Sequence, residues 1–133
     1  MVRRKHDKRL YAMKVIPKKL VAQEAMLLHT QAERLLQARV GSHPFLATLF
    51  GSFQDASSLY LVLEYVPGGD LAFHLNSRVK LSEEVTRFIA AELCLGLAHL
   101  HRHSIVHRDV KAANVLLDKE GHVRLTDFGM SKV

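Results

Sequence analysis

The chain has 133 residues and is 48% hydrophobic, so it can build a folded core and is not a disordered segment. Its formal charge of +6 comes partly from basic residues within the first ten, where no aromatic residue is interleaved, so we expect a solvated turn or terminus and no nucleic-acid partner. No apolar run is long enough for a signal peptide or a transmembrane segment, and the single cysteine, Cys94, excludes an internal disulfide. We expect an intracellular protein, in the cytoplasm or alternatively the nucleus, with Cys94 as a small buried side chain on a helix.

The first predicted elements are a strand and a helix. Residues 10–16 alternate and are β-prone, which predicts a strand that carries Lys14 near its end. Residues 21–40 place apolar side chains on one face of a helix, which Gly41 ends. Glu33 lies on this predicted helix.

Two further strands and a chain break follow. Residues 45–53 and 58–65 are rich in β-forming side chains and are separated by a short polar stretch, which predicts a hairpin. The second strand runs into Pro67-Gly68-Gly69, a cluster of residues that interrupts regular structure. We place the one plausible boundary of the chain there, between a strand-rich part and a helix-rich part.

The second part begins with two predicted helices. Asp70 can cap a short helix through Leu75, and Ser82, followed by two glutamates, can cap a longer one that reaches about His101. The longer helix carries apolar residues on much of its circumference, so we expect it to be buried.

A polar, charged loop follows the long helix. Residues 104–114 show no periodicity, whereas residues 115–117 and 122–126 predict two short strands joined by a turn. The loop is therefore held between a buried helix and a small hairpin.

Two motifs in this region carry the chemistry. The loop ends in His107-Arg108-Asp109-Val110-Lys111-Ala112-Ala113-Asn114, and Asp127-Phe128-Gly129 follows the second short strand. A charged loop is often only a solvated surface, but so many fixed identities at these spacings make that interpretation much the weaker one.

With these motifs, the segment from Leu10 onward resembles a protein kinase domain of the AGC group of serine/threonine kinases. The matching stretches are Tyr11-Ala12-Met13-Lys14, His43-Pro44-Phe45-Leu46, Leu63-Glu64-Tyr65-Val66-Pro67-Gly68-Gly69-Asp70-Leu71 and Leu125-Thr126-Asp127-Phe128-Gly129. The resemblance implies an α+β, two-lobe fold. Residues 1–133 would form part of such a domain, with about 1–66 in an N-lobe that lacks its first strands and about 67–133 as the beginning of the C-lobe.

The resemblance also implies roles in the transfer of a phosphoryl group from ATP to a serine or threonine of a protein substrate. Asp109 would accept the proton of the substrate hydroxyl, and Lys111 would contact the γ-phosphate. Asn114 and Asp127, both hard oxygen ligands, would hold magnesium ions against the phosphates.

The remaining implied roles concern the nucleotide. Lys14 would contact the α- and β-phosphates, held in place by Glu33, with Glu24 as the alternative. The backbone of Glu64 and Val66 would bind the adenine edge, and Asp70 would meet the ribose. His107 and Phe128 would belong to a stacked hydrophobic spine.

The sequence departs from the family pattern at three places. Ala113 stands where kinases that prefer basic substrates carry a glutamate, and the chain appears one residue longer between the Glu33 and His43 positions. No Gly-rich loop precedes Lys14, and the chain ends just after Asp127-Phe128-Gly129. We therefore expect a truncated, weakly stable and inactive piece of a kinase domain; the alternative is a non-catalytic interaction module or a pseudokinase-like short isoform.

Overall fold

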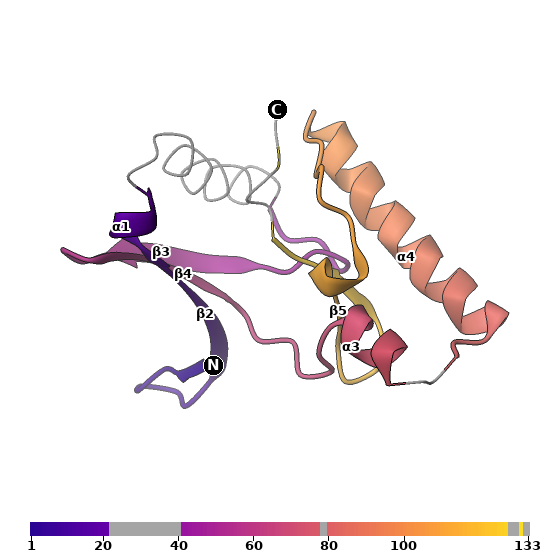
Figure 1. Cartoon of the computed structure of the whole chain (residues 1–133), viewed down its shortest axis with the longest axis horizontal. Helices are drawn as coiled ribbons and strands as arrows, with labels where there is room; N and C mark the ends of the chain where they lie inside the picture. Colours follow the sequence, from indigo (N-terminus) through magenta and orange to yellow (C-terminus); the bar gives the residue numbers. More distant parts are fainter. Residues whose placement is uncertain (22–40, 78–79, 128–130, 132–133) are drawn as a thin grey trace.

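A computed structural model of the chain describes residues 1–21, 41–77, 80–127 and 131. These residues form a four-stranded antiparallel sheet, a separate two-stranded hairpin and a long helix (Figure 1). In Figure 1 the sheet and the long helix, α4, lie at opposite sides of the molecule, and the hairpin strand β5 lies between them. The predicted α+β class is confirmed.

The sheet has the strand order β1-β2-β4-β3. Its strands are β1 (Val2–Arg3), β2 (Leu10–Pro17), β3 (Leu49–Gln54) and β4 (Ser58–Glu64). β2 runs antiparallel to β4, from Tyr11↔Glu64 to Pro17↔Ser58, and pairs Lys14 with Leu61, so Lys14 lies on a rigid element, as the sequence predicts.

The basic cluster at the start of the chain lies in the turn between β1 and β2. Arg4 forms an ion pair with Asp7, the Arg4 main-chain N–H donates to the Arg9 carbonyl (2.9 Å), and the Lys8 N–H donates to the Arg4 carbonyl (3.0 Å). The predicted turn is therefore confirmed.

The hairpin of β3 and β4 is also confirmed, but β3 begins later than the sequence predicts. Residues 45–47 contact the strand β6 (Val123–Leu125) instead of extending β3. The Leu125 N–H donates to the Phe45 carbonyl (2.9 Å), and the Ala47 N–H donates to the Leu125 carbonyl (2.9 Å). The apolar character of residues 45–47 predicts a strand, but their hydrogen bonds connect the segment before β3 to β6 of the second hairpin.

Four of the remaining elements follow the predicted order: α3 (Leu71–Asn76), α4 (Glu83–Arg102), β5 (Val115–Leu117) and β6. Two short elements were not predicted: α1 (Lys18–Val21) and the 3-10 turn η1 (Ala112–Asn114). Asp70 caps α3 by accepting a hydrogen bond from the Phe73 N–H, and Ser82 caps α4 by accepting one from the Val85 N–H, so both predicted caps are confirmed. The predicted helix over 21–40, with Glu33 and Glu24, lies outside the described residues beyond position 21.

The predicted burial of α4 is wrong for much of its circumference. Its buried residues, Ile89, Glu92, Gly96 and Leu100, form one stripe along the helix. Val85, Phe88 and Leu95 are 43%, 46% and 54% exposed, and Cys94 is exposed as well, so its predicted burial is also wrong. The reason is geometric: β6 and residues 45–46 pack against the single stripe, which leaves other faces of the helix in solvent.

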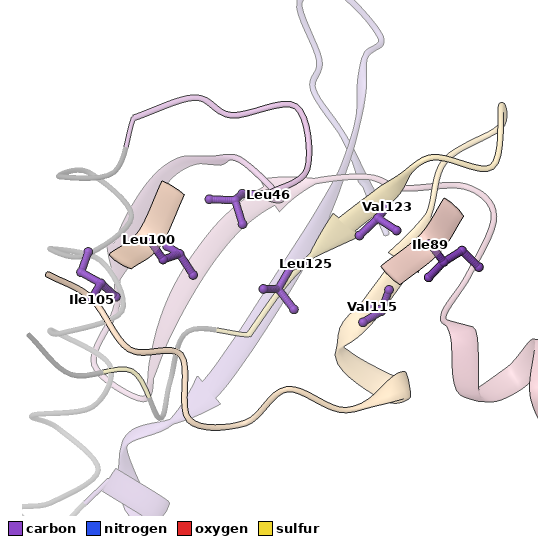
Figure 2. Packing of buried hydrophobic residues seen from close by; sticks show 7 residues of the cluster. All are labelled: Leu46, Ile89, Leu100, Ile105, Val115, Val123 and Leu125. Atoms are coloured by element: carbon purple, nitrogen blue, oxygen red, sulfur yellow. The ribbon is translucent and has the colours of Figure 1, made fainter. Parts of the chain in front are cut away.

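The hydrophobic core joins α4, the hairpin and the segment before β3. Figure 2 shows its buried side chains: Leu46, Ile89, Leu100, Ile105, Val115, Val123 and Leu125. Both hairpin strands contribute to this cluster, so the core fixes the strand that leads to Asp127 and the strand that follows the charged loop. None of the helices within the described residues is long and apolar enough to cross a membrane.

Candidate active site

The charged loop brings three of the predicted site residues into contact. The Lys111 Nζ lies 2.8 Å from Asp109 Oδ2, and the Asn114 Nδ2 donates to the same oxygen (2.9 Å) and to the Asp109 carbonyl (2.8 Å). The hydrogen bond from Lys111, followed by the one from Asn114, lowers the pKa of Asp109, although partial burial opposes the shift. The Asp109 carboxylate is therefore ionised at neutral pH.

His107 connects this loop to the end of β6. Its ring is 1% exposed, its Nδ1 lies 3.3 Å from the Asp109 N–H, and its Nε2 lies 3.1 Å from the Thr126 carbonyl. Since a main-chain N–H donates to Nδ1, the proton of the neutral ring belongs on Nε2, which donates to Thr126. Burial lowers the pKa of His107, which favours this neutral form.

Asp127 follows directly after this contact. Its carboxylate Oδ1 lies 2.8 Å from the Lys14 Nζ, so Lys14 of the sheet and Asp127, two residues beyond β6, form an ion pair across 113 sequence positions. The Thr126 N–H donates to the Asn114 carbonyl (2.9 Å), which ties Asp127 to the loop from a second side. The structure thus connects Asp127 to Lys14 by an ion pair and to Asn114 through the main chain of Thr126.

Two residues of this region have left-handed backbone conformations. The φ angles of Arg108 and Asp127 are 66° and 64°. A residue other than glycine with left-handed φ and ψ angles is strained by roughly 1–3 kcal/mol and keeps this conformation only because the surrounding contacts hold it. Both residues adjoin the His107–Thr126 contact, because Arg108 follows His107 and Asp127 follows Thr126, and the sequence offered no signal for these conformations.

The segment between the sheet and α3 carries the predicted adenine-binding positions. Glu64 ends β4, and its N–H donates to the Thr48 carbonyl (2.8 Å) while its carboxylate accepts from the Thr48 N–H (3.2 Å). Its other carboxylate oxygen lies 3.8 Å from the Arg124 Nε on β6. Glu64 therefore connects the end of the sheet to β6, and Val66, two residues on, is 8% exposed.

Gly68 and its neighbours dock this segment onto β5. The Gly68 N–H donates to the Leu117 carbonyl (2.9 Å), and the Leu117 N–H donates to the Gly69 carbonyl (2.9 Å). A Cβ on Gly68 would lie 2.4 Å from the Leu117 carbonyl oxygen, so only glycine allows this approach. Asp70, predicted to meet the ribose, follows at once and uses Oδ1 to cap α3 (2.8 Å).

Sequence reasoning missed one buried charged residue near the site. Glu92 is 6% exposed and lies on the packed face of α4, where it accepts from the Val123 N–H. The signal was present in the sequence: Glu92 falls in register with Ile89 and Gly96 on the apolar stripe, and a carboxylate on such a face needs a specific partner. Glu33, the predicted partner of Lys14, lies outside the described residues.

Comparisons with known proteins agree with this geometry. The chain matches the family model of the protein kinase domain over residues 1–133. It is 47% identical to protein kinase C zeta type of Oryctolagus cuniculus over 99% of its length, 46% identical to atypical protein kinase C of Drosophila melanogaster over 99%, and 44% identical to the cAMP-dependent protein kinase catalytic subunit of Arthrobotrys oligospora over 99%.

The chain spans 22%, 22% and 25% of the length of these three relatives. Because a protein kinase C and a cAMP-dependent kinase are among the relatives, the resemblance to the AGC group is confirmed. Proteins of this family generally use ATP and Mg²⁺. The chain belongs to the protein kinase domain family.

Proposed function

We propose that this chain carries the ATP- and magnesium-binding residues of a serine/threonine protein kinase that transfers the γ-phosphoryl group of ATP to a protein hydroxyl. One observation carries the proposal: a continuous set of contacts connects the ionised Asp109 to the ion pair of Asp127 with Lys14. Lys111 and Asn114 bind the Asp109 carboxylate. The His107 ring contacts the Asp109 N–H and the carbonyl of Thr126, the residue before Asp127. A carboxylate, two cations and two magnesium-type ligands are the groups that phosphoryl transfer requires.

The donor set of the site fits magnesium. Asp127 supplies a carboxylate, and because the Asn114 nitrogen donates to Asp109, the side-chain oxygen of Asn114 is the atom that would bind the ion. The described residues contain no group of three or more His, Cys, Asp or Glu side chains that could hold a metal ion. Magnesium commonly takes only one or two protein ligands together with phosphates and water, so two oxygens suffice.

The bound ion would neutralise the negative charge that the phosphates carry and develop during transfer. Lys14 would contact the α- and β-phosphates while the Asp127 ion pair holds its ammonium group at the site. We assign Glu33 to the support of Lys14, the backbone of Glu64 and Val66 to the adenine edge, and Asp70 to the ribose.

Asp109 would act on the substrate hydroxyl, and Lys111 on the phosphoryl group that is transferred. The hydroxyl oxygen attacks the γ-phosphorus, the bond to the leaving ADP oxygen breaks, and Asp109 takes the hydroxyl proton. Because the pKa of Asp109 is lowered, it is a weak base that mainly orients the hydroxyl until the new bond forms. Lys111, beside it, would contact the γ-phosphate, and this residue favours serine or threonine over tyrosine as the acceptor.

The partners we propose are ATP and a protein substrate inside the cell, in the cytoplasm or the nucleus. Ala113 gives no reason to expect a preference for basic substrates. A non-catalytic interaction module is the second candidate, and the activity test below separates the two.

The test is the variant Asp109→Ala in the full-length protein that contains this chain. We expect loss of phosphoryl transfer to a serine peptide with retained ATP binding, because the change removes the hydroxyl contact and leaves Lys14 and Asp127 in place. Glu120→Ala is the matched control, since Glu120 is a loop acid whose side chain is 55% exposed and pairs only with Lys119 among the contacts described. Full transfer by Asp109→Ala would contradict the assignment, and a wild-type protein that binds ATP but transfers nothing would favour the interaction module.

A further inference from the structure

Glu92 is a buried carboxylate that faces the start of β6. It lies near the middle of α4, is 6% exposed, and accepts a hydrogen bond from the Val123 N–H (2.8 Å, to Oε2). Its Oε1 lies 2.6 Å from Nδ1 of His122. Burial of a carboxylate is costly unless the charge is matched by hydrogen bonds and an opposite charge, and this site supplies both.

His122 is suited to be the cation of the pair. The hydrogen bond and the charge of Glu92, followed by the nearby Asp118 and Glu120, raise the pKa of His122, and burial opposes the shift only in part. The Phe88 ring, also on α4, lies 5.5 Å from the His122 ring. The pair therefore joins α4 to the residue immediately before β6.

The contact gives β6 a second partner along its edge. β5 pairs with one side of β6, from Val115↔Leu125 to Leu117↔Val123. The Val123 N–H donates to Glu92, and two residues later the Leu125 N–H donates to the Phe45 carbonyl (2.9 Å). Alternate N–H groups of a strand point to the same side. The Val123 and Leu125 N–H groups therefore both lie on the edge of β6 that faces away from β5, where Glu92 binds the first and residue 45 binds the second.

The strand held in this way carries Asp127. Val123 and Leu125 insert into the core cluster beside Ile89 and Leu100 of α4 (Figure 2). Beyond Leu125, the strand continues into Thr126, whose main chain contacts Asn114 and His107, and then into Asp127. Any shift of β6 along α4 therefore moves the Asp127 carboxylate relative to Lys14 and Asn114.

We propose that Glu92 is a positioning residue: together with His122 it fixes β6 against α4 and thereby sets the magnesium affinity of the Asp127 site. This inference rests on the proposed function for its magnesium part, whereas the hold of Glu92 on β6 stands on the geometry alone.

Two variants of Glu92 test the proposal. Glu92→Leu removes the acceptor and leaves the Val123 N–H without its bond, whereas Glu92→Gln keeps an oxygen for that N–H and loses the charge. Leu100→Ala is the control, because Leu100 is fully buried on the same helix and its truncation lowers stability without removing a bond to β6.

The first measurement is amide hydrogen exchange in the whole chain. We expect the exchange of the Leu125 and Thr126 N–H groups to rise about tenfold or more in Glu92→Leu, relative to amides of the sheet, and much less in Glu92→Gln. In Leu100→Ala, which loosens the core but keeps the bond from Val123 to Glu92, the rise at Leu125 and Thr126 should be no larger than at the other amides of the core cluster. A uniform rise in Glu92→Leu, or no rise, would overturn the proposal.

The second measurement is the magnesium affinity of the ATP complex of each variant. If Glu92 only stabilised the fold, this affinity would be equal in Glu92→Leu and Leu100→Ala. We expect the magnesium dissociation constant to rise several-fold in Glu92→Leu alone, with partial rescue in Glu92→Gln. Equal affinities would show that Glu92 does not position Asp127. If the wild-type chain binds no magnesium-ATP, the proposed function fails, and the exchange measurement alone decides the role of Glu92.

Discussion

His107 shows how a single residue can organise the candidate site. The family resemblance placed it in a hydrophobic spine, and its 1% exposure agrees with a buried role. The structure adds two polar contacts, to the Asp109 N–H and to the Thr126 carbonyl, that place both candidate carboxylates relative to one ring. Because a protonated ring could not accept from the Asp109 N–H, the neutral form is part of the geometry.

The identity of the charged residues could be predicted from the sequence, but their pairing could not. The spacing from Asp109 to Asn114 pointed to one loop, and the structure confirms that the two side chains meet. The ion pair of Lys14 with Asp127 joins residues 113 positions apart, and no local pattern specifies such a distance. The position of Glu92 on the apolar stripe of its helix was visible in the sequence, but its partner was not, because a helical pattern does not show which strand the buried face covers.

The environment of His43, which stacks on a second histidine, gives the fold a stability term that depends on pH. The His43 ring stacks on His99 with centroids 4.4 Å apart, and His99 lies 4.7 Å from His103. Burial, followed by the charges of His99 and Arg102, lowers the pKa of His43 below its ordinary value of 6.5. The unfolded chain then binds a proton more readily than the folded one, so this contribution is complete above about pH 6.5 and is lost as the pH falls toward the folded pKa.

We predict that His43→Asn flattens the dependence of stability on pH. Asparagine cannot titrate and can still accept the hydrogen bond that the Phe45 N–H donates to His43 Nδ1 (3.3 Å). Urea unfolding at about pH 5 and about pH 7.5 gives the difference in the free energy of unfolding, which should be smaller in the variant. His101→Asn, outside the stack, is the control; equal pH differences in wild type and His43→Asn would refute the prediction.

Most elements could be predicted from the sequence, and the errors have physical causes. The strand with Lys14, the sheet hairpin, both capped helices and the hairpin before Asp127 are confirmed because periodicity and capping residues are local signals. Residues 45–47 were wrongly read as the start of β3, since their apolar character suits a strand but their bonds go to Leu125. Only the tertiary contacts distinguish these two uses.

The docking of the linker onto β5 yields a prediction for Gly68→Ala. The added Cβ would lie 2.4 Å from the Leu117 carbonyl oxygen, so the linker or β5 must shift and the Gly68 bond to Leu117 weakens. We expect a loss of about 1–3 kcal/mol in the free energy of unfolding. The measurement is denaturant unfolding of purified protein.

The matched control for this substitution is Gly51→Ala on β3. A Cβ at Gly51 would meet nothing within 4 Å, and its φ is not in the left-handed region. The control should therefore unfold within about 0.5 kcal/mol of wild type or slightly above it, since alanine restricts the unfolded chain. If both variants lost the same stability, the close approach of Gly68 to β5 would not be what the fold requires.

At the scale of the whole molecule, β6 connects the hairpin, α4 and the segment before β3. It pairs with β5, bonds to residues 45 and 47 before the sheet strand β3, and receives Glu92 of α4. The Lys14 contact of Asp127 then reaches the far strand β2. A ligand that binds Asp127 and Lys14 together therefore bridges the sheet and the hairpin, and it should stabilise the molecule as a unit.

We accordingly predict that magnesium and ATP together raise the midpoint of thermal unfolding. At free ligand about a hundred times its dissociation constant, binding to the folded state alone adds about 2.7 kcal/mol. Asp127→Asn should abolish the part of the rise that depends on magnesium, since it removes the carboxylate while keeping the shape of the side chain. Glu120→Ala should keep the full rise. A wild-type chain with no shift would contradict nucleotide binding and favour the interaction module, whereas an undiminished shift in Asp127→Asn would remove Asp127 from the magnesium site.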